Sequence, residues 1–326
     1  MFALRGMTVS FSIFLIMYSA LSAGVICVWR RFWRYSQPRQ PRLFADRLFA
    51  LRLSPAVIAT GVTLIFAVPS FLLLEPRSGN EPVGMAAWLL GGCGVAVLLI
   101  GIWKAAAALR RASRAVARWS AESTALDSQP AASNFIDSRI SVSVLRNSAE
   151  APPLTAAGIL RPSVWLSGAA RFVLTEQELQ TALRHELVHV HRRDNLRKLL
   201  LRLLPFPGMA ELEEAWREAS EMAADDAAVS GASEALDLAA ALIKLSRLTP
   251  LQPAAELTTA LVHSPAKSVN ARVERLIAWT ERQHVPRNKG SLLYTLCAGL
   301  AVIATLAVTY GELLVKVHAA TEWLVR

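Results

Sequence analysis

The sequence predicts a multi-span α-helical membrane protein with an α+β domain inserted between its third and fourth spans. The 326-residue chain is 53% hydrophobic and only 18% charged, whereas soluble domains carry about a quarter charged residues. Four long charge-free runs account for this composition, and a stretch of ordinary polarity, residues 104–289, separates the last two. A purely water-soluble protein and a disordered chain are therefore both excluded.

Each charge-free run is long enough to cross a bilayer. The four runs have 22 residues each and contain no Asp, Glu, Lys or Arg: Thr8–Trp29, Leu53–Leu74, Pro82–Trp103 and Gly290–Gly311. Rising about 1.5 Å per residue, such helices span a hydrocarbon core of roughly 30 Å. Buried core helices rarely reach this length, and the first run is too long for the apolar region of a signal peptide. We therefore predict four membrane spans.

Basic residues predict the orientation of these spans. The loop 30–52 holds seven arginines against one acid, Asp46, and further basic residues follow the third run and precede the fourth. Because positively charged loops stay on the cytoplasmic side, we expect an outside N-terminus in a bacterial inner (cytoplasmic) membrane. In this scheme residues 1–109 hold three spans, residues 110–289 form a cytoplasmic domain, and residues 290–311 form the fourth span. Residues 312–326 then form a short extracytoplasmic tail, amphipathic enough to lie on the membrane lipids.

Net charge and cysteine content exclude two further classes of protein. The chain has a net charge of +10, but residues 104–289 contain 24 basic and 20 acidic residues, so most of the excess lies beside the membrane. Topology accounts for this charge, and we expect no nucleic-acid partner. The three cysteines are odd in number and lie far apart in apolar runs, which excludes a disulfide framework.

The inserted segment predicts a small sheet followed by helices. Residues 105–120 continue helically from the third run, and residues 123–134 are typical of a polar linker. Two runs are typical of strands: Arg139–Leu145 and Ala156–Leu166. Pro162 lies in the middle of the second run, and because proline is confined to sheet edges or bulges, we expect an edge strand. From Thr175 to about Arg282 the pattern is mostly helical.

The residues with the clearest chemistry form the sequence His185-Glu186-Leu187-Val188-His189, an H-E-x-x-H motif. A capping box, Thr175 with Glu178, predicts where its helix begins. Two histidines four apart lie on one helix face, so both imidazoles can reach one tetrahedral Zn²⁺. Glu186 would lie beside the metal-bound water and take its proton during attack on a peptide carbonyl. The alternative is a surface helix whose histidines share a face by chance. His191 projects to another face and is interpreted as structural or solvated.

A catalytic zinc site needs a third protein ligand. The longer pattern H-E-x-x-H-x-x-G-x-x-H fails, since Arg192 and Asn195 occupy the positions of its Gly and third His. Acidic residues are dense over Glu211–Asp226, where Glu221 is the candidate ligand. Asp225, one turn later, is expected to hydrogen-bond a ligating histidine, and Asp194 is expected in the same role.

Several of these motifs together resemble those of a known family. The four spans, the domain between the third and fourth, HELVHVHRRD, the E-x-x-x-D helix and GILRPSVWLS are similar to those of BlaR/MecR-type membrane metallopeptidases, sensor-transducers with a gluzincin-like domain. The resemblance implies Zn²⁺ on His185, His189 and Glu221, with Glu186 as general base. It also implies a sheet edge that holds an extended peptide substrate, formed by Gly158, Ile159, Leu160, Arg161, Pro162, Ser163, Val164 and Trp165.

One departure from that family concerns the signal. Its antibiotic sensors carry a large extracellular penicillin-binding domain after the fourth span, where this sequence has residues 312–326. We therefore expect the signal to come from a sensor partner in trans, from the short outside loops or from the membrane. The expected partner is a cytoplasmic protein substrate; a transcriptional repressor, the chain itself as substrate, and a homodimer all remain open.

Three other functions are weighed against this zinc-dependent endopeptidase. A housekeeping membrane protease of the Ste24/HtpX kind also combines spans, H-E-x-x-H and a later Glu. A non-catalytic membrane signalling scaffold would have no need of Glu186. A transporter is disfavoured because the four spans contain no ionisable Asp, Glu, Lys or Arg.

Overall fold

The computed structural model describes residues 2–33, 40–75, 84–121, 123–125, 141–145, 152–248, 257–260, 266–279 and 309–322. The chain divides into two compact units. The first unit comprises Met1–Arg34, Leu51–Leu99 and Arg282–Arg326, and the second comprises Tyr35–Ala50 and Ile100–Glu281.

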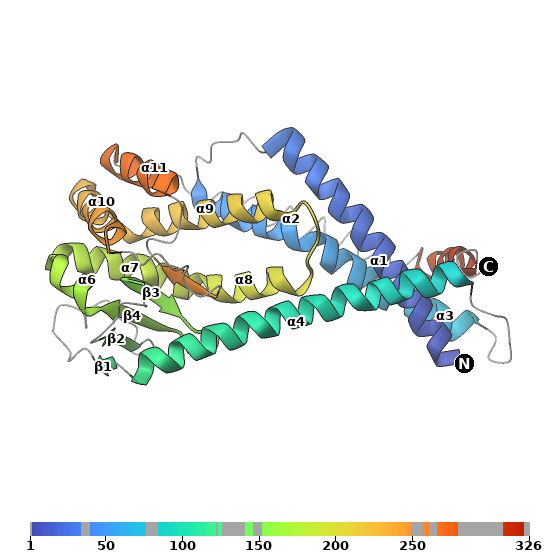
Figure 1. The fold of residues 1–326 in the computed structure, drawn as a ribbon. Coiled ribbons are helices and arrows are strands. Elements are labelled where there is room, and N and C mark those ends of the chain that lie inside the picture. Colours follow the sequence, from blue (N-terminus) through green and yellow to red (C-terminus); the bar gives the residue numbers. More distant parts are fainter. Residues whose placement is uncertain are drawn as a thin grey trace. The chain divides into compact units, whose positions relative to one another are not determined.

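Long apolar helices make up most of the first unit (Figure 1). They are α1 (Phe2–Val28) with its continuation η1 (Trp29–Trp33), α2 (Pro41–Val62) from Leu51 onward with η2 (Thr63–Ala67) and α3 (Val68–Leu74), and α4 (Met85–Ala121) as far as Leu99. Within the described residues, three helical stretches are long and apolar enough to cross a membrane: Phe2–Arg31, Pro41–Leu74 and Met85–Ala121. They contain the first two predicted spans and the third from Met85 onward; residues 82 and 83 lie outside the described residues. Most of the fourth, Gly290–Gly311, lies outside the described residues; its last three residues begin a helix over 309–322.

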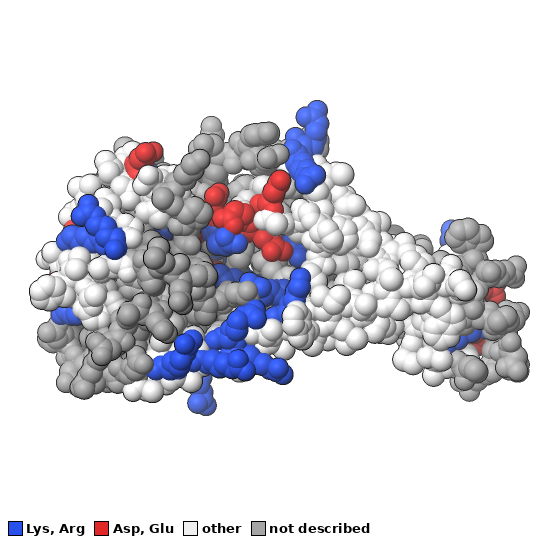
Figure 2. All heavy atoms as spheres, in the orientation of Figure 1, with Lys and Arg blue, Asp and Glu red and all other residues white. Residues whose placement is uncertain are grey.

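Small residues allow α1 and α4 to pack backbone to backbone. A Cβ added at Gly91 would lie 2.8 Å from the carbonyl oxygen of Thr8, and one at Gly94 would lie 2.6 Å from that of Phe11. The Ser12 hydroxyl donates across the same contact to the carbonyl of Ala87 at 3.0 Å. Close approach at small residues and interhelical hydrogen bonds are the usual packing forces inside a bilayer. The face of this unit drawn in Figure 2 is largely free of charged side chains, as a lipid-facing surface requires.

The second unit is built on a five-stranded sheet. Its strands are β1 (Ser123–Ala125), β2 (Ser141–Leu145), β3 (Leu154–Ala157), β4 (Ser163–Ser167) and β5 (Thr258–Ala260). Their order is β1-β2-β4-β3-β5; β2 and β4 are parallel, and the other pairs are antiparallel.

The prediction of one edge strand over Ala156–Leu166 is wrong. The run contains two antiparallel strands, β3 and β4, and β4 is paired with β2 on its other side. The chain turns between them because Gly158 adopts φ +97°, a conformation that other residues rarely adopt. Pro162 lies just before β4, where its missing N–H removes no ladder hydrogen bond. The expected substrate strand therefore consists of a turn and a central strand, and the edges of the described sheet are β1 and β5.

Helices cover this sheet and contain the H-E-x-x-H motif. They are α6 (Gly168–Val173), α7 (Glu176–Arg192), α8 (Asp194–Leu203), α9 (Ala210–Ala228), α10 (Ala232–Ser246) and α11 (Ala266–Ile277). α7 packs against β3 and β4, both α9 and α10 pack on α7, and α11 packs on α10 (Figure 1). Buried leucines, valines and alanines of these elements form the main core of the unit. The predicted capping box is confirmed: the Thr175 side chain accepts from the Glu178 N–H, and the Glu178 carboxylate accepts from the Thr175 N–H.

The start of α2 also belongs to the second unit. Residues expected to form a basic loop, 30–52, are helical from Pro41 onward, and the stretch Tyr35–Ala50 is part of this unit. The division between the two units therefore falls within α2, after Ala50.

Candidate metal centre

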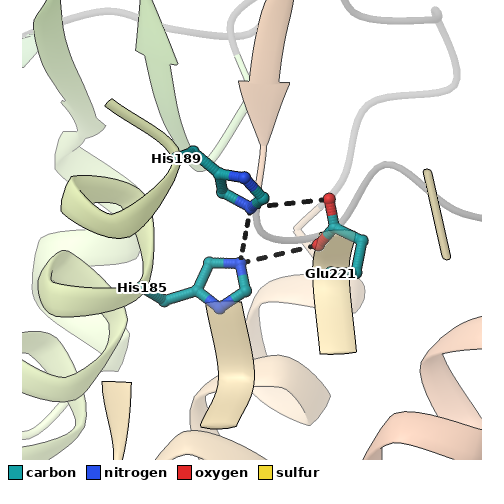
Figure 3. A group of neighbouring side chains, drawn as sticks. All are labelled: His185, His189 and Glu221. Atoms are coloured by element: carbon teal, nitrogen blue, oxygen red, sulfur yellow. Dashed lines mark hydrogen bonds and ion pairs between the residues drawn. The ribbon is translucent and has the colours of Figure 1, made fainter. Parts of the chain in front are cut away.

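Three buried side chains from two helices converge in the second unit (Figure 3). His185 and His189 lie on α7, and Glu221 lies on α9. The two Nε2 atoms are 3.2 Å apart; the Glu221 carboxylate oxygens lie 3.5 Å from Nε2 of His185 and 3.6 Å from Nε2 of His189. The helical spacing of the histidines and the close packing of α7 on α9 produce this triangle.

The triangle fits a tetrahedral zinc ion. Ligand atoms bonded to one tetrahedral Zn²⁺ at about 2.0–2.2 Å lie about 3.3 Å from one another, and the Nε2–Nε2 distance of 3.2 Å matches this spacing. The two Glu221 distances are to different oxygens, Oε2 for His185 and Oε1 for His189, and one ligand atom from each of the three residues lies within 4.8 Å of the others. Two imidazole nitrogens and one carboxylate oxygen also form the ligand set of a catalytic zinc site, which keeps its fourth position open. His185, His189 and Glu221 are thus the residues that would hold the metal.

Carboxylates lie behind both imidazoles. Nδ1 of His185 is 3.1 Å from Asp225, and Nδ1 of His189 is 2.7 Å from Asp194. Asp225 and Asp194 are also the two residues expected from the sequence to hydrogen-bond the ligating histidines. A carboxylate at Nδ1 fixes the ring orientation and leaves Nε2 facing the metal position. Burial alone would lower the pKa of His189, but Glu221 and Asp194 outweigh burial and raise it to about 10, so a metal ion binding here must displace a proton.

Arg272 is a member of this site that sequence reasoning missed. It lies on α11 and is only 3% exposed. Its guanidinium donates to both oxygens of Asp225, at 2.8 and 2.6 Å, and lies 3.0 Å from Glu221. Burial raises the pKa of both acids, but Arg272 and the neighbouring histidines together outweigh burial, lowering the pKa of Asp225 to about 2 and holding that of Glu221 well below its usual value. Both carboxylates are therefore ionised at neutral pH.

Glu186 is fully buried beside the triangle. Its Oε2 accepts from the backbone N–H of Ala156 in β3 at 3.0 Å, which fixes the carboxylate between α7 and the sheet. Burial raises the pKa of Glu186 to about 7, against the lowering effects of His189 and His185. A carboxylate whose pKa lies near the working pH is suited to accept and return a proton.

Two polar residues near the motif have structural roles. The Asn195 amide donates to the carbonyls of Ala156 and Gly158, both at 3.3 Å, and thus ties the start of α8 to β3. Nδ1 of His191 lies 2.7 Å from the carbonyl oxygen of Leu187 on its own helix. Neither residue belongs to the metal-binding triangle.

A second His/Glu group lies in the first unit, with different geometry. His318 lies between two acids, with Nδ1 4.0 Å from Glu75 and Nε2 3.6 Å from Glu322. A single imidazole ring presents only one of its nitrogens to one ion, and Glu75 is already paired with Arg5 at 2.9 Å. This arrangement fits an ion-pair cluster better than a metal site.

Comparison with known proteins places the residues of the metal-binding triangle within a region that matches a peptidase family. A sequence model of the family described as BlaR1 peptidase M56 matches residues 76–276, more than half of the chain. The match includes α7 with its H-E-x-x-H motif, Glu221 on α9 and most of α11 with Arg272. The comparison with curated proteins finds no match. The chain belongs to the BlaR1 peptidase M56 family.

Proposed function

We propose that the protein is a membrane-embedded, zinc-dependent endopeptidase that cleaves a cytoplasmic protein in signal transduction. The observation that carries this proposal is the buried triangle of His185, His189 and Glu221 with Glu186 beside it. The M56 family match supports a peptidase of the BlaR1 type.

The residues of the site have distinct roles in this proposal. His185, His189 and Glu221 would hold Zn²⁺, which when bound would polarise a peptide carbonyl as a Lewis acid and lower the pKa of water. Glu186 accepts the proton of the attacking water and returns it to the leaving amine, so that water is added across the peptide bond. Asp225 and Asp194 hold the imidazoles in orientation, and Arg272 holds the carboxylates of Asp225 and Glu221.

Orientation and substrate are also part of the proposal. Seven arginines in residues 30–52 favour a cytoplasmic location for the second unit, with an outside N-terminus in a bacterial inner membrane. The substrate would then be a cytoplasmic protein such as a repressor, or the chain itself. A housekeeping protease of the Ste24/HtpX kind would have the same chemistry and a broader range of substrates.

A non-catalytic scaffold is disfavoured by the environment of Glu186. Burying a carboxylate raises its pKa and opposes folding unless a partner compensates, and Glu186 is fully buried with a pKa near 7. A scaffold without catalytic activity would gain nothing from a buried carboxylate at this position.

The direct test is Glu186→Gln in the detergent-purified chain, assayed for both cleavage and bound zinc. We expect the variant to lose proteolysis, because the amide accepts no proton, while its zinc content stays at the level of the parent. Cleavage of a peptide library at the parental rate by the variant would overturn the assignment of Glu186.

A further inference from the structure

The start of α2 carries the only acid of the basic segment 30–52, Asp46. This segment belongs to the second unit from Tyr35 to Ala50. An oxygen of Asp46 lies 2.8 Å from Nη1 of Arg197 and 3.6 Å from Nη2 of Arg192. Arg192 ends α7 and Arg197 lies on α8, so one carboxylate holds the cations on either side of the turn between these helices.

The same two arginines also face Asp194. Oδ1 of Asp194 lies 3.6 Å from Nε of Arg192 and 3.9 Å from Nη1 of Arg197, while its Oδ2 lies 2.7 Å from Nδ1 of His189. Asp194 is 1% exposed, so these contacts are little screened by water. A continuous series of charged contacts therefore runs from Asp46 to an imidazole of the metal-binding triangle.

An apolar contact joins the same segment to the other metal-binding helix. The ring of Phe49 on α2 lies 6.1 Å from that of Trp216 on α9, five residues before Glu221 in sequence. The guanidinium of Arg197 lies 5.2 Å from the centre of the Phe49 ring, within cation–π range. Residues Asp46 and Phe49 thus contact elements that support both the His189 and the Glu221 sides of the triangle.

We propose that Asp46 is a positioning residue of the metal centre, which holds Arg192 and Arg197 so that Asp194 keeps the imidazole of His189 in place. The proposal rests on the proposed function and adds to it a residue that positions a metal-binding histidine. Asp46 lies near the start of α2, in the part of that helix that belongs to the second unit.

The direction of the effect follows from charge. Two guanidinium groups share two carboxylates, Asp46 and Asp194. When Asp46 loses its charge, both cations turn more fully to Asp194 and weaken its hydrogen bond to His189. Partners that contact a metal-binding histidine directly change metal affinity by about 10- to 100-fold when mutated. Asp46 acts one contact further away, so we expect zinc affinity to fall by about 3- to 10-fold in Asp46→Asn.

The test compares Asp46→Asn with a matched control in the full detergent-purified chain. Glu214→Gln removes another acid paired with an arginine, Arg217, on the same helix as Glu221. The Glu214 side chain, 44% exposed, matches Asp46, which is 42% exposed, but its arginine partner is not one of the two that face Asp194. Zinc affinity is measured by competition with a chromophoric chelator, and ligand geometry by the visible absorption of the Co²⁺-substituted protein. We expect Asp46→Asn to lower affinity and shift the spectrum, Glu214→Gln to change neither, and Asp46→Glu to restore both.

Two further measurements make every outcome decisive. Thermal unfolding in the presence of a chelator checks that the variants fold. If Asp46→Asn does not fold, Arg197→Gln removes the other partner of the Asp46–Arg197 ion pair and tests the same contact. Parental affinity and an unchanged Co²⁺ spectrum in a folded Asp46→Asn or Arg197→Gln variant would overturn this inference alone. A parent chain that binds neither metal would overturn the proposed function with it.

Discussion

Arg272 and Asp225 form a buried two-point ion pair, with Nε–Oδ2 and Nη2–Oδ1 distances of 2.8 and 2.6 Å. The same guanidinium reaches Glu221, and Asp225 faces Nδ1 of His185. One cation on α11 therefore balances two acids on α9, and each of those acids faces a histidine of α7. The metal-binding triangle depends on three helices rather than on the two that supply its ligands.

Replacing Arg272 is expected to damage both folding and metal binding. In Arg272→Gln the buried carboxylates of Asp225 and Glu221 lose their counter-charge, and removing one partner of a buried ion pair destabilises a protein by about 3–5 kcal/mol. Arg275→Gln is the matched control, because this neighbour pairs with the partly exposed Asp226 and touches no ligand. The melting temperature and the zinc content of the two purified variants measure these effects. Equal losses of stability and of zinc in both variants would contradict the role given to Arg272.

The capping box of α7 is expected to stabilise the second unit. Thr175→Ala removes the acceptor for the Glu178 N–H, a change that costs about 1 kcal/mol at helix N-termini. Ser246→Ala, which removes an exposed hydroxyl near the end of α10, serves as the control. Thermal unfolding of both variants in detergent measures the difference, and a Thr175→Ala variant as stable as Ser246→Ala would refute it.

Glu178 makes this contribution pH-dependent. Burial raises its pKa, but hydrogen bonds with Lys244 and Thr175 outweigh burial, so the net pKa is lowered from 4.5. A group whose pKa is lower in the folded protein stabilises it above the unfolded value, and this stabilisation is lost as the pH falls through the folded value. Between pH 6 and about pH 3, the melting temperature of Glu178→Gln should fall less than that of the parent. Parallel curves would contradict this linkage.

The turn between β3 and β4 is expected to require glycine. At Gly158 the φ of +97° strains any side chain, and a Cβ would lie 2.5 Å from the carbonyl oxygen of Arg161. Gly158→Ala should therefore lower stability by about 1–3 kcal/mol. Gly231→Ala is the control, since a Cβ added there would meet no described atom within 4 Å. Equal melting temperatures for the two variants would show that the turn tolerates a side chain.

Local patterns predicted the part of the site that lies on one helix. The spacing of His185 and His189 and the Thr175–Glu178 cap depend only on residues a few positions apart, and helical geometry fixes how they lie. Glu221 could be proposed because a catalytic zinc site needs a third protein ligand besides the two histidines, and acids are dense on the helix that contains Glu221. Its distance from the histidines, by contrast, depends on how α9 packs on α7.

Contacts between distant segments could not be predicted in this way. Arg272 lies in an ordinary amphipathic helix, and nothing in its neighbourhood indicates a buried ion pair with Asp225, 47 positions away. Asp46 and Arg197 are 151 positions apart and meet only in the folded chain. The edge-strand prediction failed because Pro162 lies in the turn between two strands and not inside one: β3, just before the turn, pairs with β4 on one side, and β2, from earlier in the sequence, pairs with it on the other.

The zinc-to-protein ratio of the detergent-purified chain, measured beside Glu221→Ala and Glu218→Ala, tests the central claim most directly. Glu218 lies on the same helix and is exposed, so it controls for loss of an acid from α9. A three-ligand site predicts about one zinc per chain in the parent and in Glu218→Ala, and a marked loss in Glu221→Ala. A parent without zinc under chelator-free conditions, or full zinc content in Glu221→Ala, would contradict the site described here.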